Sequence, residues 1–247
     1  MIFRQLFDHK SSTYTYLLGD ENSGKAALID PVLEKVEDYK TVLSNLKLYL
    51  EITLDTHTHA DHITAQGTLR ELYGCVTMMG RESESECISH TFTHQQIIQL
   101  GRITIQTLHT PGHTLDSYSF FVKENEKADI HTPMVFTGDT LLIRGTGRTD
   151  FQQGDAKTQF QSLNKILLTL PENTIVYPGH DYKGWTSSTI AEEKKHNPRL
   201  QFSTKETYAA HMASLNLPNP EMMDIAVPLN QACGKSDSGK SPAKEDK

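Results

Sequence analysis

The chain of 247 residues has few cysteines, and no hydrophobic run in it is long enough to span a membrane. Its three cysteines, Cys75, Cys87 and Cys233, are an odd number without the paired spacing of metal ligands. We therefore expect reduced thiols, as in a cytosolic protein. Residues 1–5 lack the basic segment and apolar core of a signal peptide. We expect a cytoplasmic protein without a membrane partner, or an organellar one whose transit peptide has been removed.

Positive charge is also scarce, since 24 Lys and Arg stand against 31 Asp and Glu, a net charge of −7 at pH 7. A protein that binds nucleic acid usually presents a basic face, so we expect no nucleic-acid partner. The chain lacks the glycine-rich fingerprint of dinucleotide-binding proteins, and it shows no internal repeat. Residues 234–247 contain no large apolar side chain. We predict one domain over residues 1–233 and a disordered tail over residues 234–247.

Short apolar strands alternate with helices whose apolar residues recur at spacings of three and four. The expected strands cover residues 2–6, 13–18, 26–30, 48–55, 75–79, 102–108, 117–123, 134–137 and 174–177. The expected helices cover residues 33–46, 63–73, 187–196 and 203–215, and another begins at Asp155. Ser203 and Glu206 have the spacing of a capping box. Residues 80–94 are polar and receive no element. The pattern predicts an α/β domain of layered sheets.

Three histidines and an aspartate fall within six residues directly after the expected strand over residues 48–55. They are His57, His59, Asp61 and His62. Imidazole and carboxylate groups together suit divalent metals such as zinc or iron. The alternative is a histidine-rich surface loop without a ligand.

Three further turns carry residues of the same kind, namely His113, Asp139 and His180, and a glycine precedes each of them. Glycine lets the backbone turn sharply and approach its neighbours closely. Each residue alone could be a turn histidine, a cap or a surface residue. All four turns follow strands, however, and strand ends at one edge of a sheet can converge on a site. The combined pattern HxHxDH…H…D…H therefore predicts a metal centre.

This pattern resembles that of the metallo-β-lactamase superfamily. The resemblance implies an αββα sandwich of two mixed β-sheets flanked by helices, with the metal site at one sheet edge. In a hydrolase of this superfamily with two metal ions, His57, His59 and His113 would hold one ion. Asp61, His62 and His180 would hold the other, and Asp139 would bridge them.

Longer stretches are similar to the signatures of one family within it, the persulfide dioxygenases, also known as sulfur dioxygenases. These stretches cover residues 141–154, 177–184, 197–200, 215–218 and 226–230. The resemblance implies a non-haem iron enzyme with one Fe(II) per chain, held by His57, His113 and Asp139. It would use O₂ to oxidise the sulfane sulfur of a glutathione persulfide to sulfite and release glutathione, in sulfide metabolism. His59, Asp61, His62 and His180 would then be neighbours of the ligands, and a homodimer is plausible.

The same signatures place Arg148, Tyr182 and Arg199 where they would line a substrate channel. Arginine pairs bidentately with carboxylates, and glutathione carries two. The alternative for Arg148 and Arg199 is an internal salt bridge that holds a loop. Asp150 is expected to orient Arg148 rather than to contact the substrate.

The chain departs from the family pattern at two positions that are often cysteine, where it has Ser117 and Thr146. Residues 80–99 also match the family poorly. Two alternative functions remain open at this point. One is a glutathione thioester hydrolase of the glyoxalase II (hydroxyacylglutathione hydrolase) type, with two zinc ions or mixed metals. The other is a domain that stores metal or signals redox state without catalysis.

Overall fold

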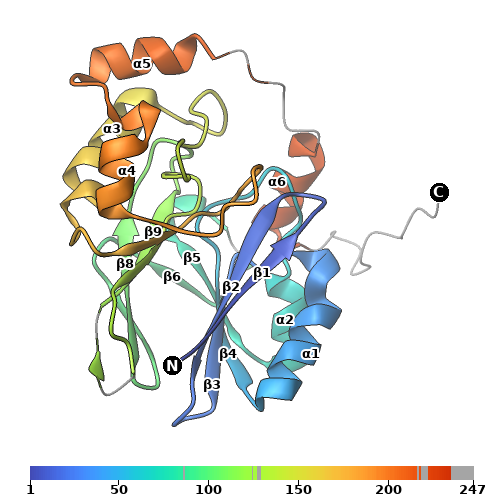
Figure 1. The fold of residues 1–247 in the computed structure, drawn as a ribbon. Coiled ribbons are helices and arrows are strands. Elements are labelled where there is room, and N and C mark those ends of the chain that lie inside the picture. Colours follow the sequence, from blue (N-terminus) through green and yellow to red (C-terminus); the bar gives the residue numbers. More distant parts are fainter. Residues whose placement is uncertain (86, 124, 127–128, 216, 218–221, 235–247) are drawn as a thin grey trace.

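The computed structural model describes residues 1–85, 87–123, 125–126, 129–215, 217 and 222–234. Of the expected C-terminal tail, residues 235–247 lie outside this range. The described chain folds into two six-stranded sheets packed face to face, with helices on both outer sides (Figure 1). This arrangement confirms the expected αββα sandwich.

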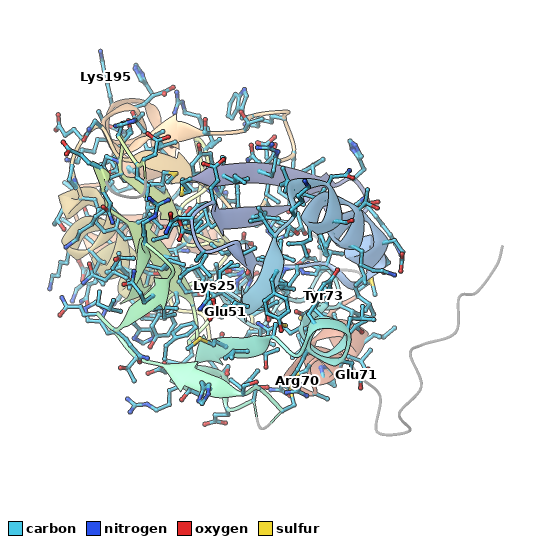
Figure 2. The ribbon with its side chains drawn as sticks, turned by 90° about the horizontal axis from the view of Figure 1, so that it is seen from below. Lys25, Glu51, Arg70, Glu71, Tyr73 and Lys195 are labelled. Carbon is cyan, nitrogen blue, oxygen red and sulfur yellow. A yellow bond between two sulfur atoms is a disulfide. The ribbon has the colours of Figure 1, made fainter. Side chains whose placement is uncertain are left out.

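The first sheet contains six strands in sequence order. The pairings from β1 to β3 are antiparallel, and those from β3 to β6 are parallel. They are β1 (Ile2–Asp8), β2 (Thr13–Asp20), β3 (Lys25–Ile29), β4 (Tyr49–Leu54), β5 (Val76–Gly80) and β6 (His90–Phe92). Seen from below, Lys25 on β3 lies beside Glu51 on β4, where the two side chains form an ion pair of 2.8 Å (Figure 2).

The second sheet has the order β12-β11-β10-β9-β8-β7 and is antiparallel except between β10 and β11. Its strands are β7 (Ile97–Leu100), β8 (Ile103–His109), β9 (Tyr118–Val122), β10 (Met134–Phe136), β11 (Ile175–Tyr177) and β12 (Ser188–Thr189). The β3, β4, β8, β10 and β11 strands therefore all deliver loops that can contribute to one edge of the sandwich.

Helices cover the outer face of each sheet. On the first sheet, Tyr39 and Leu43 of α1 (Val36–Leu46) and Leu69 of α2 (Gln66–Tyr73) pack against the strands. The second sheet is covered by α3 (Ala156–Lys165), α4 (Ile190–His196) and α5 (Lys205–Ala213). The short α6 (Met223–Gln231) lies apart from α5, on the side of α1 and α2 (Figure 1). Single 3₁₀ turns occur at Leu33–Lys35, Arg81–Ser83, Leu167–Thr169 and Pro198–Leu200.

The core between the sheets is rich in aromatic rings. Tyr16 on β2 contacts Phe136 on β10, with ring centroids 4.9 Å apart, and Phe120 on β9 is fully buried beside Phe92. Aromatic side chains bury large apolar areas, so these contacts fix the spacing of the two sheets.

Several expected helix boundaries differ from the structure. The second helix begins at Gln66 rather than at residue 63, because the Ile63 carbonyl accepts a hydrogen bond from Leu33 and Thr64 forms a β-bridge with Val32. The helix expected over residues 187–196 begins at Ile190, since Ser188–Thr189 pair with β11.

Near the C-terminus, Thr204 rather than Ser203 caps α5, because its hydroxyl accepts the Thr207 amide. The Asp155 cap of α3 is confirmed, with its carboxylate accepting the Thr158 amide at 2.7 Å. Strand β6 and helix α6 lie where no element was expected.

The expectation of reduced cysteines is wrong for two of the three. Cys87 and Cys233 form a disulfide with an S–S distance of 2.03 Å, and Cys75 is a buried free thiol. The partners are 146 residues apart in sequence, so their pairing depends on the tertiary fold and has no signature in the spacing. Among the described residues, no helix is both long and apolar enough to cross a membrane.

Replacement of Phe120 by alanine should lower the free energy of unfolding by about 3–5 kcal/mol, because it opens a cavity between the sheets. Leu72 on α2 is 52% exposed, and its replacement by alanine should change the stability by no more than about 0.5 kcal/mol. Equilibrium urea unfolding in the presence of a chelator measures both. Equal losses for the two variants would contradict the assigned core.

Candidate metal centre

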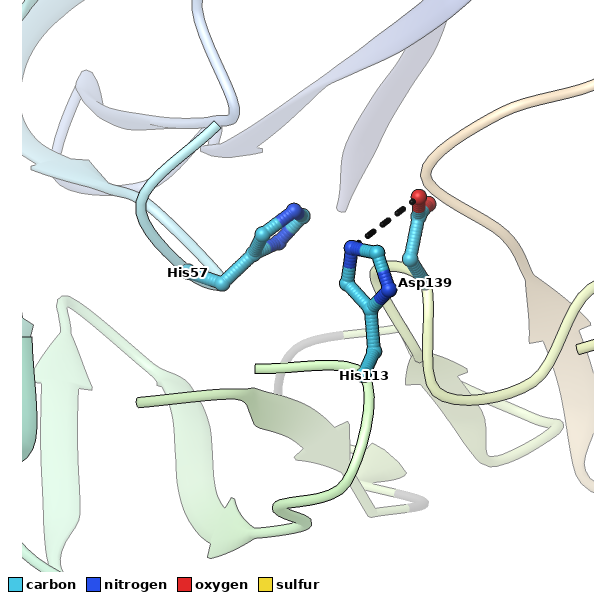
Figure 3. Close-up of side chains that lie close together, drawn as sticks. All are labelled: His57, His113 and Asp139. Carbon is cyan, nitrogen blue, oxygen red and sulfur yellow. Dashed lines mark ion pairs between the residues drawn. The ribbon is translucent and has the colours of Figure 1, made fainter. Parts of the chain in front are cut away.

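Four turns meet at one edge of the sandwich. His57 follows β4 of the first sheet, whereas His113, Asp139 and His180 follow β8, β10 and β11 of the second. One ligand atom from each of His57, His113 and Asp139 lies within 4.8 Å of the others. Figure 3 shows these three side chains turned toward one another, with His113 Nε2 3.6 Å from Asp139 Oδ2. Three residues from three separate turns thus form one compact donor set.

The histidines of this set are held with Nε2 free. His113 Nδ1 donates to the carbonyl oxygen of Arg148 at 2.7 Å, and a carbonyl can only accept, so the lone pair of the ring is on Nε2. His57 Nδ1 lies 3.0 Å from the Thr56 hydroxyl, which donates onward to the Asp30 carboxylate at 3.0 Å. Such backing bonds orient metal-binding histidines.

The protonation states suit metal binding. Burial, with the adjacent His59 and His113, holds the pKa of His57 well below its ordinary value, so this imidazole is neutral. Burial alone would raise the pKa of Asp139, but His180 and the two facing histidines outweigh it and keep the carboxyl well below its usual range. The set therefore offers a neutral imidazole on His57 and a carboxylate on Asp139, beside the imidazole of His113.

His180 lies between two carboxylates. Its Nδ1 is 2.7 Å from Asp139 Oδ1, and its Nε2 is 2.8 Å from Asp61 Oδ2. Burial would lower the pKa of His180, but Asp139 and Asp61 raise it well above the ordinary histidine value. The protonated ring donates to both carboxylates, which leaves Asp139 Oδ2 on the side of His113.

His59, Asp61 and His62 form a second group of possible ligands within 4.8 Å. His59 Nδ1 and His62 Nε2 are buried and have no hydrogen-bond partner among the described residues. Buried polar atoms are rarely left unpaired, so these two nitrogens fit a second ion. Burial would lower the pKa of His59, but Asp30 and other nearby carboxylates raise it to about 9. Without a second ion, His59 instead carries a proton.

Two aspartates that the sequence pattern did not single out support the histidine turn. The Asp30 carboxylate accepts the Thr56 amide at 2.7 Å and lies 3.1 Å from His59 Nε2. Asp116 accepts both the amide and the hydroxyl of Thr58, at 2.9 and 2.6 Å. Asp30 could have been recognised in the sequence, because it directly follows an apolar strand, β3, as the histidine turn follows its parallel neighbour β4. Asp116 occupies the position next to Ser117, one of the two departures from the family pattern.

Glycine is required where the turns approach most closely. A Cβ on Gly138 would lie 2.6 Å from the Thr56 hydroxyl oxygen, and its φ of +49° is unfavourable for other residues. A Cβ on Gly147 would lie 2.3 Å from the Asp139 carbonyl oxygen and 2.8 Å from His113 Nδ1. These contacts leave no room for side chains behind Asp139 and His113.

The donor set opens into a cleft of about 720 Å³, whose lining includes Arg148, Tyr182 and Arg199. Arg148 is paired bidentately with Asp150 at 2.7 and 2.8 Å, and its guanidinium lies over the Phe151 ring. Arg199 instead donates to the carbonyl and the hydroxyl of Thr146, with no carboxylate partner among the described residues. Thr146 stands where the family often has cysteine, and its hydroxyl accepts a hydrogen bond from Arg199.

Comparison with known proteins agrees with this architecture. The family model described as "Metallo-beta-lactamase superfamily" matches residues 10–180. The chain therefore belongs to the metallo-β-lactamase superfamily.

Mitochondrial persulfide dioxygenase ETHE1 of Mus musculus is 46% identical to the chain over 235 residues, which cover 95% of this chain and 89% of the mouse protein. The crystal structure of ETHE1 from Myxococcus xanthus superposes with a TM-score of 0.90 at 49% identity and covers 95% of this chain and 100% of that one. A probable hydroxyacylglutathione hydrolase of Schizosaccharomyces pombe is 38% identical over 186 residues, covering 74% of this chain and 68% of the yeast protein. Within the superfamily, the chain belongs to the ETHE1-type persulfide dioxygenases, and the expectation of an enzyme is confirmed.

Replacement of Asp139 by alanine should abolish metal binding, because it removes the anionic member of the set and leaves His180 paired only with Asp61. The bound metal is measured after dialysis against Fe(II) under anaerobic conditions. Asp150→Ala is the matched control, since it removes an exposed carboxylate outside the set. Full metal occupancy in the Asp139 variant would contradict the donor set.

Proposed function

We propose that the chain is a mononuclear iron dioxygenase that oxidises the sulfane sulfur of glutathione persulfide to sulfite and releases glutathione. The observation that carries this proposal is the set of His57, His113 and Asp139 at the base of an open cleft. Two histidines and one carboxylate on one side of an ion leave positions open, as in non-haem Fe(II) oxygenases. The similarity to persulfide dioxygenases over nearly the whole chain supports the same reaction.

The reaction needs no further reductant. The persulfide anion, O₂ and one water give glutathione, sulfite and a proton, and the sulfane sulfur loses the four electrons that O₂ accepts. When bound, Fe(II) supplies the redox chemistry between these reactants. The chain's own groups supply the rest: the Nε2 atoms of His57 and His113, an anionic Asp139, and a proton held on His180 between two carboxylates.

Arg199 is the better candidate for binding a carboxylate of the glutathione moiety. Its guanidinium is bonded to neutral acceptors only among the described residues, whereas Arg148 is already neutralised by Asp150. The internal pairing considered as the alternative thus describes Arg148 better than Arg199. Tyr182, 74% exposed at the rim of the cleft, offers a hydroxyl to the same ligand.

We propose the partners, the assembly and the location of the protein from the sequence analysis. Glutathione persulfide and O₂ are its partners, a homodimer is its proposed assembly, and nucleic acid and membranes play no part. The cytoplasm, or an organelle if a transit peptide is removed, is its proposed location, and the mouse relative is named mitochondrial.

The second candidate is a glutathione thioester hydrolase with two metal ions. The unpaired nitrogens of His59 and His62 favour it, as does the similarity to the yeast protein named a probable hydroxyacylglutathione hydrolase. That relative covers less of the chain than the dioxygenases do, and the dioxygenase remains the proposal.

Replacement of His59 by alanine distinguishes the two candidates. In a mononuclear dioxygenase the variant, when saturated with Fe(II), should still hold one iron per chain and consume O₂ with glutathione persulfide, because His59 packs against His57 but is not a ligand. In a dinuclear hydrolase it should lose one of two ions. Metal analysis is combined with an oxygen electrode, sulfite detection and a thioester assay on the same samples. Absence of O₂ consumption by fully iron-loaded wild-type protein would reject the dioxygenase.

Replacement of Arg199 by alanine should raise KM for glutathione persulfide about 10–100-fold, with a smaller effect on kcat. This range corresponds to losing a hydrogen bond to a charged group, about 1.5–3 kcal/mol. Arg199→Lys keeps the positive charge but lacks the bidentate guanidinium, so its KM should lie between those of the wild type and Arg199→Ala. Lys195→Ala, on the exposed side of α4, serves as the control. An unchanged KM in Arg199→Ala would exclude this contact.

A further inference from the structure

The C-terminal segment 222–234 contacts the histidine turn through Asn230, one of several buried side chains in this segment. Asn230, 1% exposed at the end of α6, donates its amide hydrogens to the carbonyl oxygens of His59 and His62 at 2.9 and 2.8 Å. Its Oδ1 accepts the Thr64 amide at 2.8 Å. Asparagine is suited to this task, because one side chain provides two donors and one acceptor. The three bonds fix the backbone on both sides of Asp61.

The fixed backbone is connected to the proposed ligand His57. The ring of His59 packs against that of His57, with centroids 4.2 Å apart. His59 Nε2 lies 3.1 Å from Asp30 Oδ1, and the same carboxylate accepts the Thr56 hydroxyl that contacts His57. A shift of the backbone at His59 therefore moves the ring that supports His57, although Asn230 contacts no atom of the donor set directly.

The segment that carries Asn230 is fastened at its end. The Cys233 carbonyl accepts the amide of Gly67 in α2 at 3.1 Å, and a Cβ on Gly234 would lie 2.2 Å from the Thr64 carbonyl oxygen. The disulfide between Cys233 and Cys87 attaches the same point to the connection that follows β5. A disulfide across 146 residues restricts the chain strongly. Breaking this bond would release the end of the segment that carries Asn230 from its attachment at Cys87.

We propose that Asn230 is a positioning residue for the metal centre and that the Cys87–Cys233 disulfide fastens it, so that metal retention depends on the redox state of this cysteine pair. The inference rests on the proposed metal centre. It adds to the donor set a positioning residue, Asn230, and control of metal retention by the oxidation state of a disulfide. Outer partners of metal ligands commonly affect metal affinity by about 10–100-fold.

The test uses Co(II) as the probe, because its visible spectrum reports ligand geometry. Asn230→Asp keeps the size and the acceptor but places an oxygen against the His59 and His62 carbonyls. It should alter the Co(II) spectrum and speed removal of the ion by a chelator about 10–100-fold. Gln231→Ala changes the adjacent, exposed side chain and should match wild type. A residue with only a structural role would lower the melting temperature of the metal-free protein without changing the Co(II) spectrum of the folded holoprotein.

The disulfide is tested in the same assay. Reduction of the wild-type protein by a phosphine should speed removal of Co(II) by the chelator, as should the Cys87→Ser substitution. The phosphine should have no further effect on the Cys87→Ser variant. The double variant Cys87→Ser/Asn230→Asp should lose metal no faster than Asn230→Asp alone. Reduction of the wild-type protein and the single Cys87→Ser substitution keep Asn230 in place, so both remain informative if Asn230→Asp does not fold.

The possible outcomes separate the two proposals. Wild-type protein that binds no Co(II) would contradict the metal centre itself. Wild-type protein that binds Co(II) normally while Asn230→Asp behaves like Gln231→Ala would overturn the role of Asn230. Faster metal loss in Asn230→Asp, with no effect of reduction or of Cys87→Ser, would overturn the role of the disulfide.

Discussion

The metal centre depends on the packing of one sheet against the other. His57 belongs to the first sheet, whereas His113 and Asp139 belong to the second, so no single sheet contains the donor set. The distance between the ligand atoms is therefore set by the aromatic layer between the sheets, where Tyr16 contacts Phe136. Close-packed interiors transmit small displacements. The core between the sheets thus determines whether three side chains can share one ion.

Packing alone does not orient the ligands. Each proposed ligand uses its second polar atom to bind the protein: His113 to the Arg148 carbonyl, His57 to Thr56, and Asp139 to His180. These bonds select the tautomer and the oxygen that remain available to an ion. They also explain why buried charges are tolerated here, since Asp139, His180 and Asp61 form an alternating sequence of carboxylate, imidazolium and carboxylate.

The sequence was informative where chemistry and strand ends coincide. His57, His113, Asp139 and His180 were recognisable because uncommon residue types follow apolar strands, and the structure brings them to one edge. Asn230 could not be recognised in this way, because it acts on backbone carbonyls more than 160 residues away and its helix contains Pro228. The disulfide was missed for a related reason. Cys87 and Cys233 come together only in the folded protein, where the C-terminal segment packs beside the first sheet. The sequence positions of three cysteines do not show which two of them pair.

The same limit applies to the histidine cluster, whose members have different environments despite their short spacing. His57, Asp61 and His62 line the cleft, whereas the His59 side chain is fully buried and is bound to Asp30 behind it. An ion at His59 would have to displace the proton that the surrounding carboxylates favour. All three members of the set His57, His113 and Asp139 line the cleft, whereas His59 is not among its lining residues. The contact of His59 with Asp30, which the spacing HxHxDH does not express, is thus what separates His59 from the three-residue set.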